Sequence, residues 1–133
     1  MRERVKKYFE NFQKALRNLK IGVETSENDL DIDGTLKRFE LCYELAWKLI
    51  KVYLEDLGII CRNPRDCFKQ AFQNDLIHDV EKWYQLLEDR NLLVHTYTFE
   101  ESKEVFERVK LEYLSLFEHL FNKVREQLEE RNL

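Results

Sequence analysis

The sequence predicts an all-α protein, an antiparallel, up-and-down four-helix bundle with one extra short helix. The 133 residues include 3 glycines and 1 proline, which leaves few of the turn positions that a β-protein needs. Apolar residues recur at steps of three and four in long stretches rich in Leu, Glu, Lys and Arg, the pattern of amphipathic helices. A chain of this length with 44% hydrophobic residues can bury one core, so we expect one domain over residues 1–133.

The first half of the chain predicts two long helices. The first covers about residues 2–20 and ends near Gly22, and a polar connection, VETSENDLDID, follows it. The second runs from Leu36 and closes at Gly58. Its apolar arc is wide, as in a helix that is covered on two sides, by its own bundle and by another subunit.

The second half predicts three further helices. Asn63-Pro64 is typical of a helix start, and a short helix follows through Phe68. A fourth helix, marked by Val80, Trp83 and Leu87, leads into the stretch RNLLVHTY. Thr98-Phe-Glu-Glu101 has the pattern of a capping box, so the last helix starts near Phe99 and continues to about Leu128.

Charge and cysteine content limit the class of protein. The formal net charge is -4, which argues against a broad basic surface for duplex nucleic acid and leaves room for a local cationic site. Cys42, Cys61 and Cys67 are odd in number and fit no metal or redox spacing, so we expect reduced thiols that pack in the core. No apolar run is long enough for a signal peptide or a membrane span, and we expect a cytoplasmic protein.

The stretch RNLLVHTY, residues 90–97, brings an arginine, a histidine and a tyrosine together. In an unbroken helix the side chains of Arg90 and His95 point about 140° apart and do not meet. Because the next helix is capped at Thr98, we expect His95 and Tyr97 at or beyond the end of the fourth helix, and two arrangements stay open. Either the helix end frays and turns His95 back, or two copies of the segment face each other across a twofold axis. Both produce a compact cationic site at one end of the bundle.

These residue types suit RNA cleavage without a metal. Arginine holds a phosphate through two parallel hydrogen bonds, and histidine moves protons near neutral pH, so Arg90 and His95 are the candidate catalytic residues. Tyr97 is a candidate for orienting the phosphate or for being modified. By spacing alone, a helix-end salt bridge with a hydrogen-bonded histidine is the competing interpretation.

A second stretch, DLDIDGTLKRFE from Asp29 to Glu40, matches the calcium-binding EF-hand pattern in full. EF-hand loops come in pairs between two helices, whereas this one is a single copy after a polar loop. We therefore expect an acidic helix N-terminus and no metal site. Glu40 shares a helix face with Glu44, which pairs with Lys48; we expect solvated surface charge, or residues that support the site or bind a partner.

The remaining conspicuous side chains are interpreted as structural. His78 and His119 lack a companion ligand at metal-binding spacing and are expected to be ordinary surface histidines. Trp47 and Trp83 are expected to anchor the core or an interface. We expect no cofactor.

Two stretches resemble one family. RNLLVHTY resembles the Arg-x4-His-x-Tyr signature of the HEPN superfamily, and RFELCYELAWKLIKVYLEDLG, residues 38–58, resembles the second helix of its nucleotidyltransferase substrate-binding branch. NPRDCFKQAFQNDLI and the region of Trp83 continue the likeness, which covers about residues 30–125. The resemblance implies an HEPN-like bundle that forms a homodimer, and a complex with a small nucleotidyltransferase of the MNT type encoded nearby.

The resemblance implies two alternative functions that share one groove. In the first, the chain is the HEPN subunit of a two-component minimal nucleotidyltransferase (MNT) system and binds nucleotide or substrate and the partner transferase. In the second, it is the toxin ribonuclease of a toxin-antitoxin pair, and its partner neutralises it by attaching AMP. Carried over to this chain, Arg90 binds the phosphate, His95 is the catalytic base or acid, and Tyr97 receives AMP. Asn91 matches the polar position beside the arginine and can orient His95.

The chain is not expected to be the transferase itself. That chemistry needs a Gly-Ser turn followed by paired aspartates that bind metal. None of Gly22, Gly34 and Gly58 precedes a serine. The catalytic half of such a system must be another polypeptide.

Overall fold

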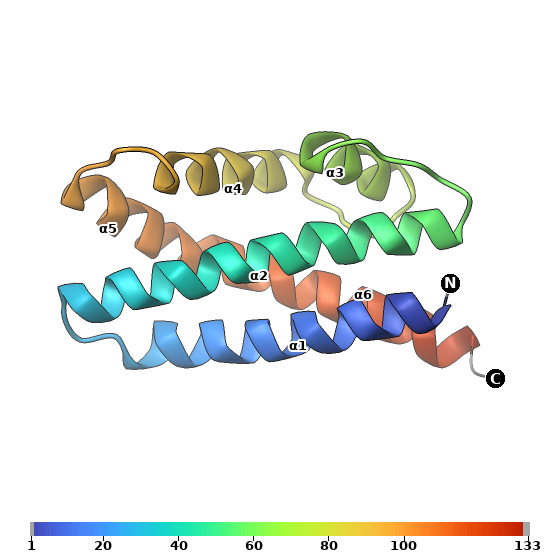
Figure 1. Ribbon diagram of the computed structural model, residues 1–133, viewed down its shortest axis with the longest axis horizontal. Coiled ribbons are helices and arrows are strands. Elements are labelled where there is room, and N and C mark those ends of the chain that lie inside the picture. Colours follow the sequence, from blue (N-terminus) through green and yellow to red (C-terminus); the bar gives the residue numbers. More distant parts are fainter. Residues whose placement is uncertain (1, 132–133) are drawn as a thin grey trace.

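The computed structural model describes residues 2–131, and every regular element in that range is helical, with no strand (Figure 1). This confirms the all-α fold. In chain order the elements are α1 (Arg2–Thr25), α2 (Asp29–Asp56), α3 (Pro64–Gln73), α4 (Val80–Leu93), α5 (Phe99–Arg108), a π-helical segment η1 (Val109–Tyr113) and α6 (Leu114–Arg131). No helix within residues 2–131 is long and apolar enough to cross a membrane.

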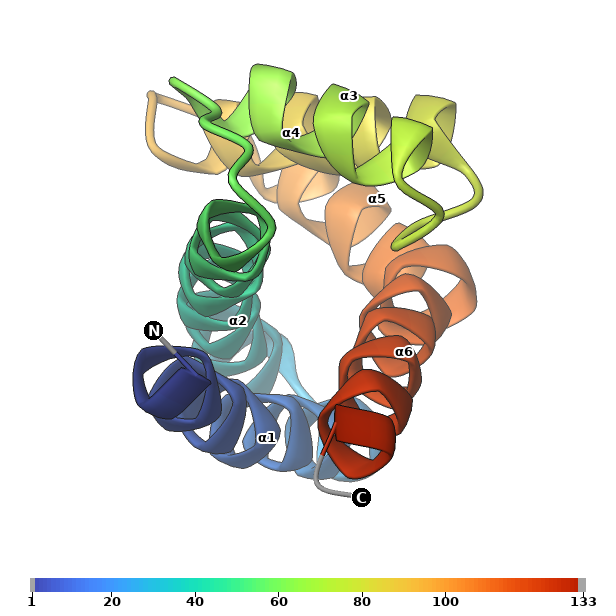
Figure 2. The same ribbon diagram turned by 90° about the vertical axis from the view of Figure 1, so that its right-hand side faces the viewer.

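The helices form a bundle around one core. α1 and α2 make an antiparallel hairpin, and α5, η1 and α6 follow one another as a bent rod (Figure 1). A view along the bundle shows α1, α2 and α6 on three sides, with the shorter α3 and α4 side by side across the fourth (Figure 2). α3 is the extra short helix of the prediction. Large side chains fill the centre, among them Phe12, Phe39, Tyr43, Phe68, Trp83, Tyr113 and Phe117.

The connection between α1 and α2 is much shorter than expected. α1 continues past Gly22, and α2 begins at Asp29 instead of Leu36, so most of the predicted polar connection is helical. Asn28 explains the early start. Its side chain accepts a hydrogen bond of 2.9 Å from the backbone N–H of Asp31 and so caps the helix.

The EF-hand-like stretch is therefore part of a helix. Asp29, Asp31 and Asp33 stand at the start of α2, where side chains two residues apart point about 200° apart, so the three do not converge on one point. Among the described residues no group of three or more side chains is arranged to hold a metal ion. Carboxylates at a helix N-terminus are favoured by the helix dipole, and the interpretation as an acidic helix start is confirmed.

The wide apolar arc of α2 is covered by the same chain. Cys42, Leu49 and Val52 on this arc are buried, and Leu45 packs against the core in a partly exposed position. α1 lies against one side of α2, and α3 and α5 lie against others. Leu41 stays 55% exposed. α1, α3 and α5 thus cover most of the arc within the chain, and additional cover by a second subunit stays a prediction.

The later helix boundaries follow the expected signals. Asn63 caps α3, and Thr98 and Glu101 form the capping box that starts α5. The final helix, expected to be continuous, is interrupted by η1, where the N–H of Leu114 bonds to the carbonyl oxygen of Val109. Nothing in the apolar pattern distinguishes such a π-type turn from ordinary α-helix.

The cysteines require a correction. Cys61 and Cys67 form a disulfide bond that ties the connection after α2 to the first turn of α3, whereas Cys42 is a free, buried thiol. Burial raises the pKa of the Cys42 thiol well above its usual range. The prediction of three reduced packing thiols was wrong for two of them, because the pairing depends on how the connection folds back on α3 and not on a recognisable spacing.

Candidate functional site

An open groove between α2 and α4 gathers several of the residues predicted for the site. Its volume is about 700 Å³, and its walls are formed by Gly34, Lys37, Arg38, Glu40, Leu41, Glu44 and Arg90. Arg90 comes from the last turn of α4, and the other residues come from α2. Three cationic side chains and two carboxylates thus border a groove that also exposes the apolar Leu41.

Arg90 is held in a defined orientation at the edge of this groove. Its Nη2 donates to Oε1 of Glu44 at 3.1 Å, and its Nη1 donates to Oδ1 of Asn91 at 3.3 Å. The guanidinium also lies 5.1 Å from the ring centre of Tyr43, a cation–π contact. Within the described chain, the Nε of Arg90 is buried and lacks a hydrogen-bond partner. The two hydrogen bonds use one N–H of each terminal nitrogen, so each terminal nitrogen keeps a second N–H, and the side chain is 28% exposed.

Tyr43 forms the floor beneath Arg90. Its side chain is 1% exposed and packs edge-on against Phe68 in the core. Burial raises the pKa of Tyr43 to about 12, while Arg90 acts to lower it and Glu44 to raise it. The phenol is neutral at physiological pH and offers the guanidinium an uncharged ring face. The contact between Tyr43 and Arg90 could not be predicted from sequence, because the two residues are far apart along the chain.

The two supporting carboxylates both border the groove. Glu44 binds Arg90, accepts a hydrogen bond from the indole N–H of Trp47 at 3.2 Å and lies 3.7 Å from the Nζ of Lys48. Glu40 lies on the same wall, where it pairs with an exposed lysine, Lys37, at 3.4 Å. Of the two carboxylates, Glu44 is thus the one that holds the predicted phosphate-binding residue.

His95 and Tyr97 lie on the connection between α4 and α5. α4 ends at Leu93, as expected from a motif that runs past the helix end, and the backbone N–H of His95 donates to the carbonyl oxygen of Leu92 at 3.2 Å. The side chain of His95 is exposed, and Tyr97 is 40% exposed. No hydrogen bond or ion pair joins Arg90 to His95 within residues 2–131. The structure unites Arg90, Asn91 and Glu44, and leaves His95 and Tyr97 at the surface.

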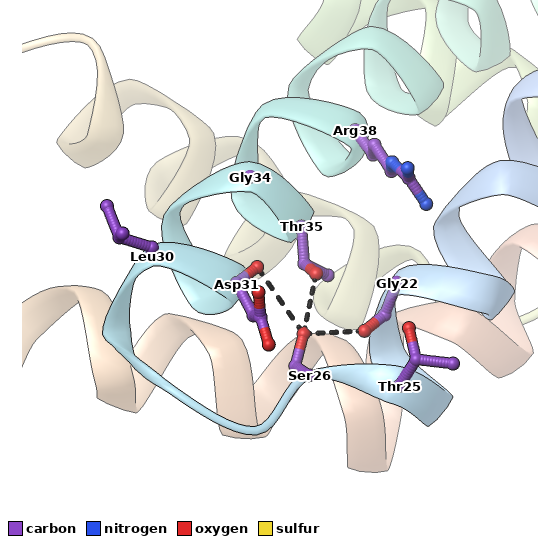
Figure 3. Close-up of a pocket in the computed structure, with 8 residues that line it drawn as sticks. All are labelled: Gly22, Thr25, Ser26, Leu30, Asp31, Gly34, Thr35 and Arg38. Carbon is purple, nitrogen blue, oxygen red and sulfur yellow. Dashed lines mark hydrogen bonds between the residues drawn. The ribbon is translucent and has the colours of Figure 1, made fainter.

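A smaller pocket lies at the turn between α1 and α2 (Figure 3). The Ser26 hydroxyl donates to the carbonyl oxygen of Gly22 at 2.6 Å and lies 2.8 Å from the Thr35 hydroxyl (Figure 3). Gly34 and Arg38 line both this pocket and the groove beside Arg90. The hydroxyls of the pocket bond to one another and to the backbone, so their main role is to close the turn.

A buried cluster of charged and polar side chains is centred on Asp89, the residue before Arg90 in α4. Asp89 is 8% exposed and accepts two hydrogen bonds from Arg108, one from Nε at 2.7 Å and one from Nη2 at 2.9 Å. The phenol of Tyr113 also donates to Asp89. Burial, reinforced by Asp89, raises the pKa of Tyr113, and the hydrogen bonds to Asp89 raise the pKa of Arg108. This cluster could not be predicted from sequence, because its members are far apart along the chain.

His78 and His119, expected to be unrelated surface residues, contact each other. Their ring centres are 4.0 Å apart in an edge-to-face arrangement. The pKa of His119 is lowered by burial first, and then by the neighbouring charges of His78 and Lys123, while Glu126 acts to raise it. No sequence signal indicates this contact, because the two histidines come from the connection before α4 and from α6.

Comparison with known proteins identifies the family. The model of a family described as nucleotidyltransferase substrate binding protein like matches residues 7–126. The chain is 31% identical over 88 residues to the probable ribonuclease HepT of Haemophilus influenzae, a match that covers 61% of this chain and 59% of that protein. The chain thus matches less than two thirds of the length of this curated relative.

Solved structures share the fold. A protein of Thermus thermophilus has a TM-score of 0.73 and 27% identity, and the match covers 88% of this chain and 98% of that one. The toxin-antitoxin MntA–HepT has a TM-score of 0.75 at 17% identity, covering 92% and 97%. A Haemophilus influenzae protein described as having the fold of a substrate-binding domain of a nucleotidyltransferase has a TM-score of 0.63 at 22% identity, covering 94% and 99%. The chain belongs to the nucleotidyltransferase substrate-binding protein family, which confirms the branch of the HEPN superfamily that the sequence resembles.

Proposed function

We propose that this chain is the HEPN subunit of a two-component minimal nucleotidyltransferase system, and that it binds a phosphate of nucleotide or RNA in the groove between α2 and α4. The observation that carries the proposal is the setting of Arg90. Its guanidinium is fixed by Glu44, Asn91 and the ring of Tyr43 at the edge of an open groove, and each of its terminal nitrogens keeps a second N–H that can donate to a ligand. A guanidinium held in this way loses little conformational freedom when a phosphate binds.

Charge in the groove supports the same function. Lys37 and Arg38 also line the groove, where Lys37 pairs with Glu40 at 3.4 Å and Arg38 donates to the carbonyl oxygen of Asn18 at 2.8 Å, so the lining as a whole keeps a net positive charge. Glu44 limits non-specific attraction, because its carboxylate already neutralises Arg90 in the empty groove. An incoming phosphate must compete with Glu44, which favours ligands that contact several of these cations at once.

A second candidate function is that of a toxin ribonuclease that cleaves RNA without a metal. The exposed His95 and Tyr97 favour it, because a general base must reach RNA and a modified phenol must reach a partner enzyme. The curated relative is named a probable ribonuclease. In this function Arg90 and His95 are catalytic, and a partner nucleotidyltransferase neutralises the chain by AMPylation of Tyr97. The attached AMP would put a phosphate where RNA phosphate binds.

Partners and compartment belong to the proposal as well. We propose a homodimer through the motif end of the bundle, where Val94, Tyr97 and Phe99 are exposed at 50%, 40% and 36%. A twofold axis there would bring Arg90 of one protomer toward His95 of the other. The second partner is an MNT-type nucleotidyltransferase. We propose the cytoplasm as the compartment, because RNA and ATP are both found there. Its reducing conditions would favour the reduced form of Cys61 and Cys67.

Phosphate binding is tested with a matched pair of arginines. Arg65 resembles Arg90 in its contacts: it pairs with Glu88 at 2.8 Å and lies 4.7 Å from the ring centre of Tyr84, but it is outside the groove. Fluorescence anisotropy with a short labelled RNA should give an affinity about tenfold weaker for Arg90→Ala, which loses a charge-assisted hydrogen bond. Arg65→Ala should leave the affinity unchanged. Equal losses for both variants would reduce the effect to net charge and contradict the groove.

The two candidate functions are separated by a cleavage assay. Purified chain is incubated with RNA in the presence of EDTA, and His95→Ala serves as the inactive comparison. Cleavage by the wild type that disappears in His95→Ala supports the ribonuclease. Binding without cleavage supports the substrate-binding subunit. Incubation with the neighbouring transferase, ATP and Mg²⁺ then shows by intact mass whether AMP is attached, and Tyr97→Phe should abolish any such addition.

A further inference from the structure

The buried cluster centred on Asp89 depends on a local departure from α-helical geometry. Arg108 and Tyr113 are five residues apart, and in a regular α-helix their side chains would point about 140° apart. The segment η1 lies between them and has the wider turn of a π-helix. Both side chains can therefore reach the same carboxylate, Asp89. Because π-type turns are frequent at functional sites, the π-turn of η1 is a candidate for a functional role.

The contacts of Asp89 are directional, unlike the rest of the α4 interface. Trp83, Leu86, Leu87 and Leu93 hold α4 by apolar packing, which tolerates small rotations of the helix. The two parallel hydrogen bonds from Arg108 and the third from Tyr113 all end on Asp89, and together they fix the rotation of α4 about its axis and its position along that axis. Low exposure of Asp89, at 8%, protects these bonds from competition by water.

The position of Asp89 along the chain connects the cluster to the site. Asp89 immediately precedes Arg90, whose guanidinium faces α2 and binds Glu44. The short connection that carries His95 and Tyr97 leaves α4 at Leu93 and enters α5, whose last residue is Arg108. Asp89 thus bonds the helix before the connection to the helix and the π-turn after it.

We propose that Asp89, held by Arg108 and Tyr113, is a positioning residue that fixes the orientation of Arg90 toward the groove and restrains the connection that carries His95. This inference rests on the proposed function of the groove. Asp89 does not itself face the groove, so its effect on ligand binding is transmitted through the backbone of α4 and through the restrained ends of the connection.

The structural part of the proposal is tested by hydrogen exchange followed by mass spectrometry. Tyr113→Phe removes one hydrogen bond and keeps the buried ring, and Asp89→Asn keeps the shape and removes the charge. In both, the peptide covering residues 90–97 should exchange about tenfold faster than in the wild type, while peptides of α1 should be unchanged. Tyr113→Phe is the decisive variant if Asp89→Asn does not fold.

The control uses the ion pair between α4 and η1, the element that also contains Tyr113. Lys82 at the start of α4 pairs with Glu112 of η1, so Lys82→Met also removes an α4–η1 contact but lies two turns before the motif. Exchange of residues 90–97 should be unaffected by this change. Equal acceleration in Lys82→Met, or a uniform acceleration over the whole chain, would show a general loss of stability and overturn the positioning role.

A binding measurement completes the test. With fully folded protein, Tyr113→Phe should weaken RNA binding about threefold to tenfold, while Lys82→Met should leave it unchanged. If the wild type binds no RNA, the proposed function fails, and the exchange data still decide whether Asp89 restrains the motif. If exchange accelerates locally and RNA affinity is unchanged, the cluster orders the connection without positioning Arg90, and the inference is wrong.

Discussion

At Gly22 the helix α1 packs closely against Thr35 of α2, and Gly22→Ala is predicted to destabilise the protein. A Cβ atom at Gly22 would lie 2.8 Å from Oγ1, 3.2 Å from Cγ2 and 3.3 Å from Cβ of Thr35. Thr35 cannot move away easily, because it is 3% exposed and its hydroxyl is hydrogen-bonded to Ser26. The helices must therefore separate or the side chain must leave its preferred rotamer.

The magnitude follows from two opposing contributions. Replacing a glycine by alanine inside a helix stabilises by about 1 kcal/mol. Forcing extra atoms into a packed interface costs about 1–3 kcal/mol, and three close contacts with a buried side chain put this site in the upper half of that range. We expect Gly22→Ala to lower the free energy of unfolding by about 1–2 kcal/mol.

Urea unfolding followed by far-UV circular dichroism measures this change, and the chain provides its own control. Gly34 is also inside a helix, but an added Cβ there meets nothing within 4 Å. Gly34→Ala should therefore stabilise by about 0.5–1 kcal/mol. In a Thr35→Ala background the clash is relieved, and Gly22→Ala should become neutral or stabilising. If Gly22→Ala and Gly34→Ala stabilise equally, the close approach of α1 and α2 does not exist and the reasoning fails.

Three further predictions concern a histidine, a disulfide bond and a helix cap outside the groove. The pKa of His119 is below its ordinary value of 6.5, so the unfolded chain binds a proton at this residue more tightly than the folded chain does. The contribution of His119 to stability should therefore be complete above pH 6.5 and decline as the pH falls below it. His119→Gln should flatten this part of a plot of unfolding free energy against pH. The same flattening by His78→Gln would be smaller, because burial contributes more than the neighbouring ring. Reduction of the Cys61–Cys67 bond opens only a short loop, since the two are 6 residues apart, and should lower the free energy of unfolding by about 2 kcal/mol in a urea titration with and without dithiothreitol; no change would mean that the thiols are reduced in the purified protein. Thr98→Ala removes the N-cap of α5 and should cost about 1 kcal/mol in thermal unfolding, whereas Thr98→Ser should cost little; equal losses would contradict the capping role of the hydroxyl.

The features that could be predicted from sequence are those encoded locally. The cap at Asn63 and the box at Thr98 involve residues a few positions apart, and both fix a helix start wherever the rest of the chain lies. The box also limited the end of α4, and so led to the expectation that His95 lies beyond a helix end. Arg90 and Glu44 were each singled out for their setting in family-like stretches, and their contact came from the fold.

The features that were missed depend on pairing between distant segments. Asp89 looked like one of many surface carboxylates, because neither Arg108 nor Tyr113 is near it in sequence and the π-turn that aligns them has no signature. The start of α2 was placed too late for a different reason. Aspartates are weak helix formers, and they read as a loop until Asn28 is recognised as the cap that lets the dipole favour them.

The π-turn of η1 also sets how the C-terminal part of the chain can change in length. Each residue added to or removed from a helix rotates everything beyond it by about 100°. A π-type turn accommodates one extra residue, so deleting one residue within Val109–Tyr113 would turn this segment into regular α-helix and still leave Phe117 and Leu120, both fully buried, facing the core. Single-residue deletions among relatives should therefore be tolerated better in this segment than in the rest of α6, and a designer who straightens it should remove one residue and keep the buried face of α6.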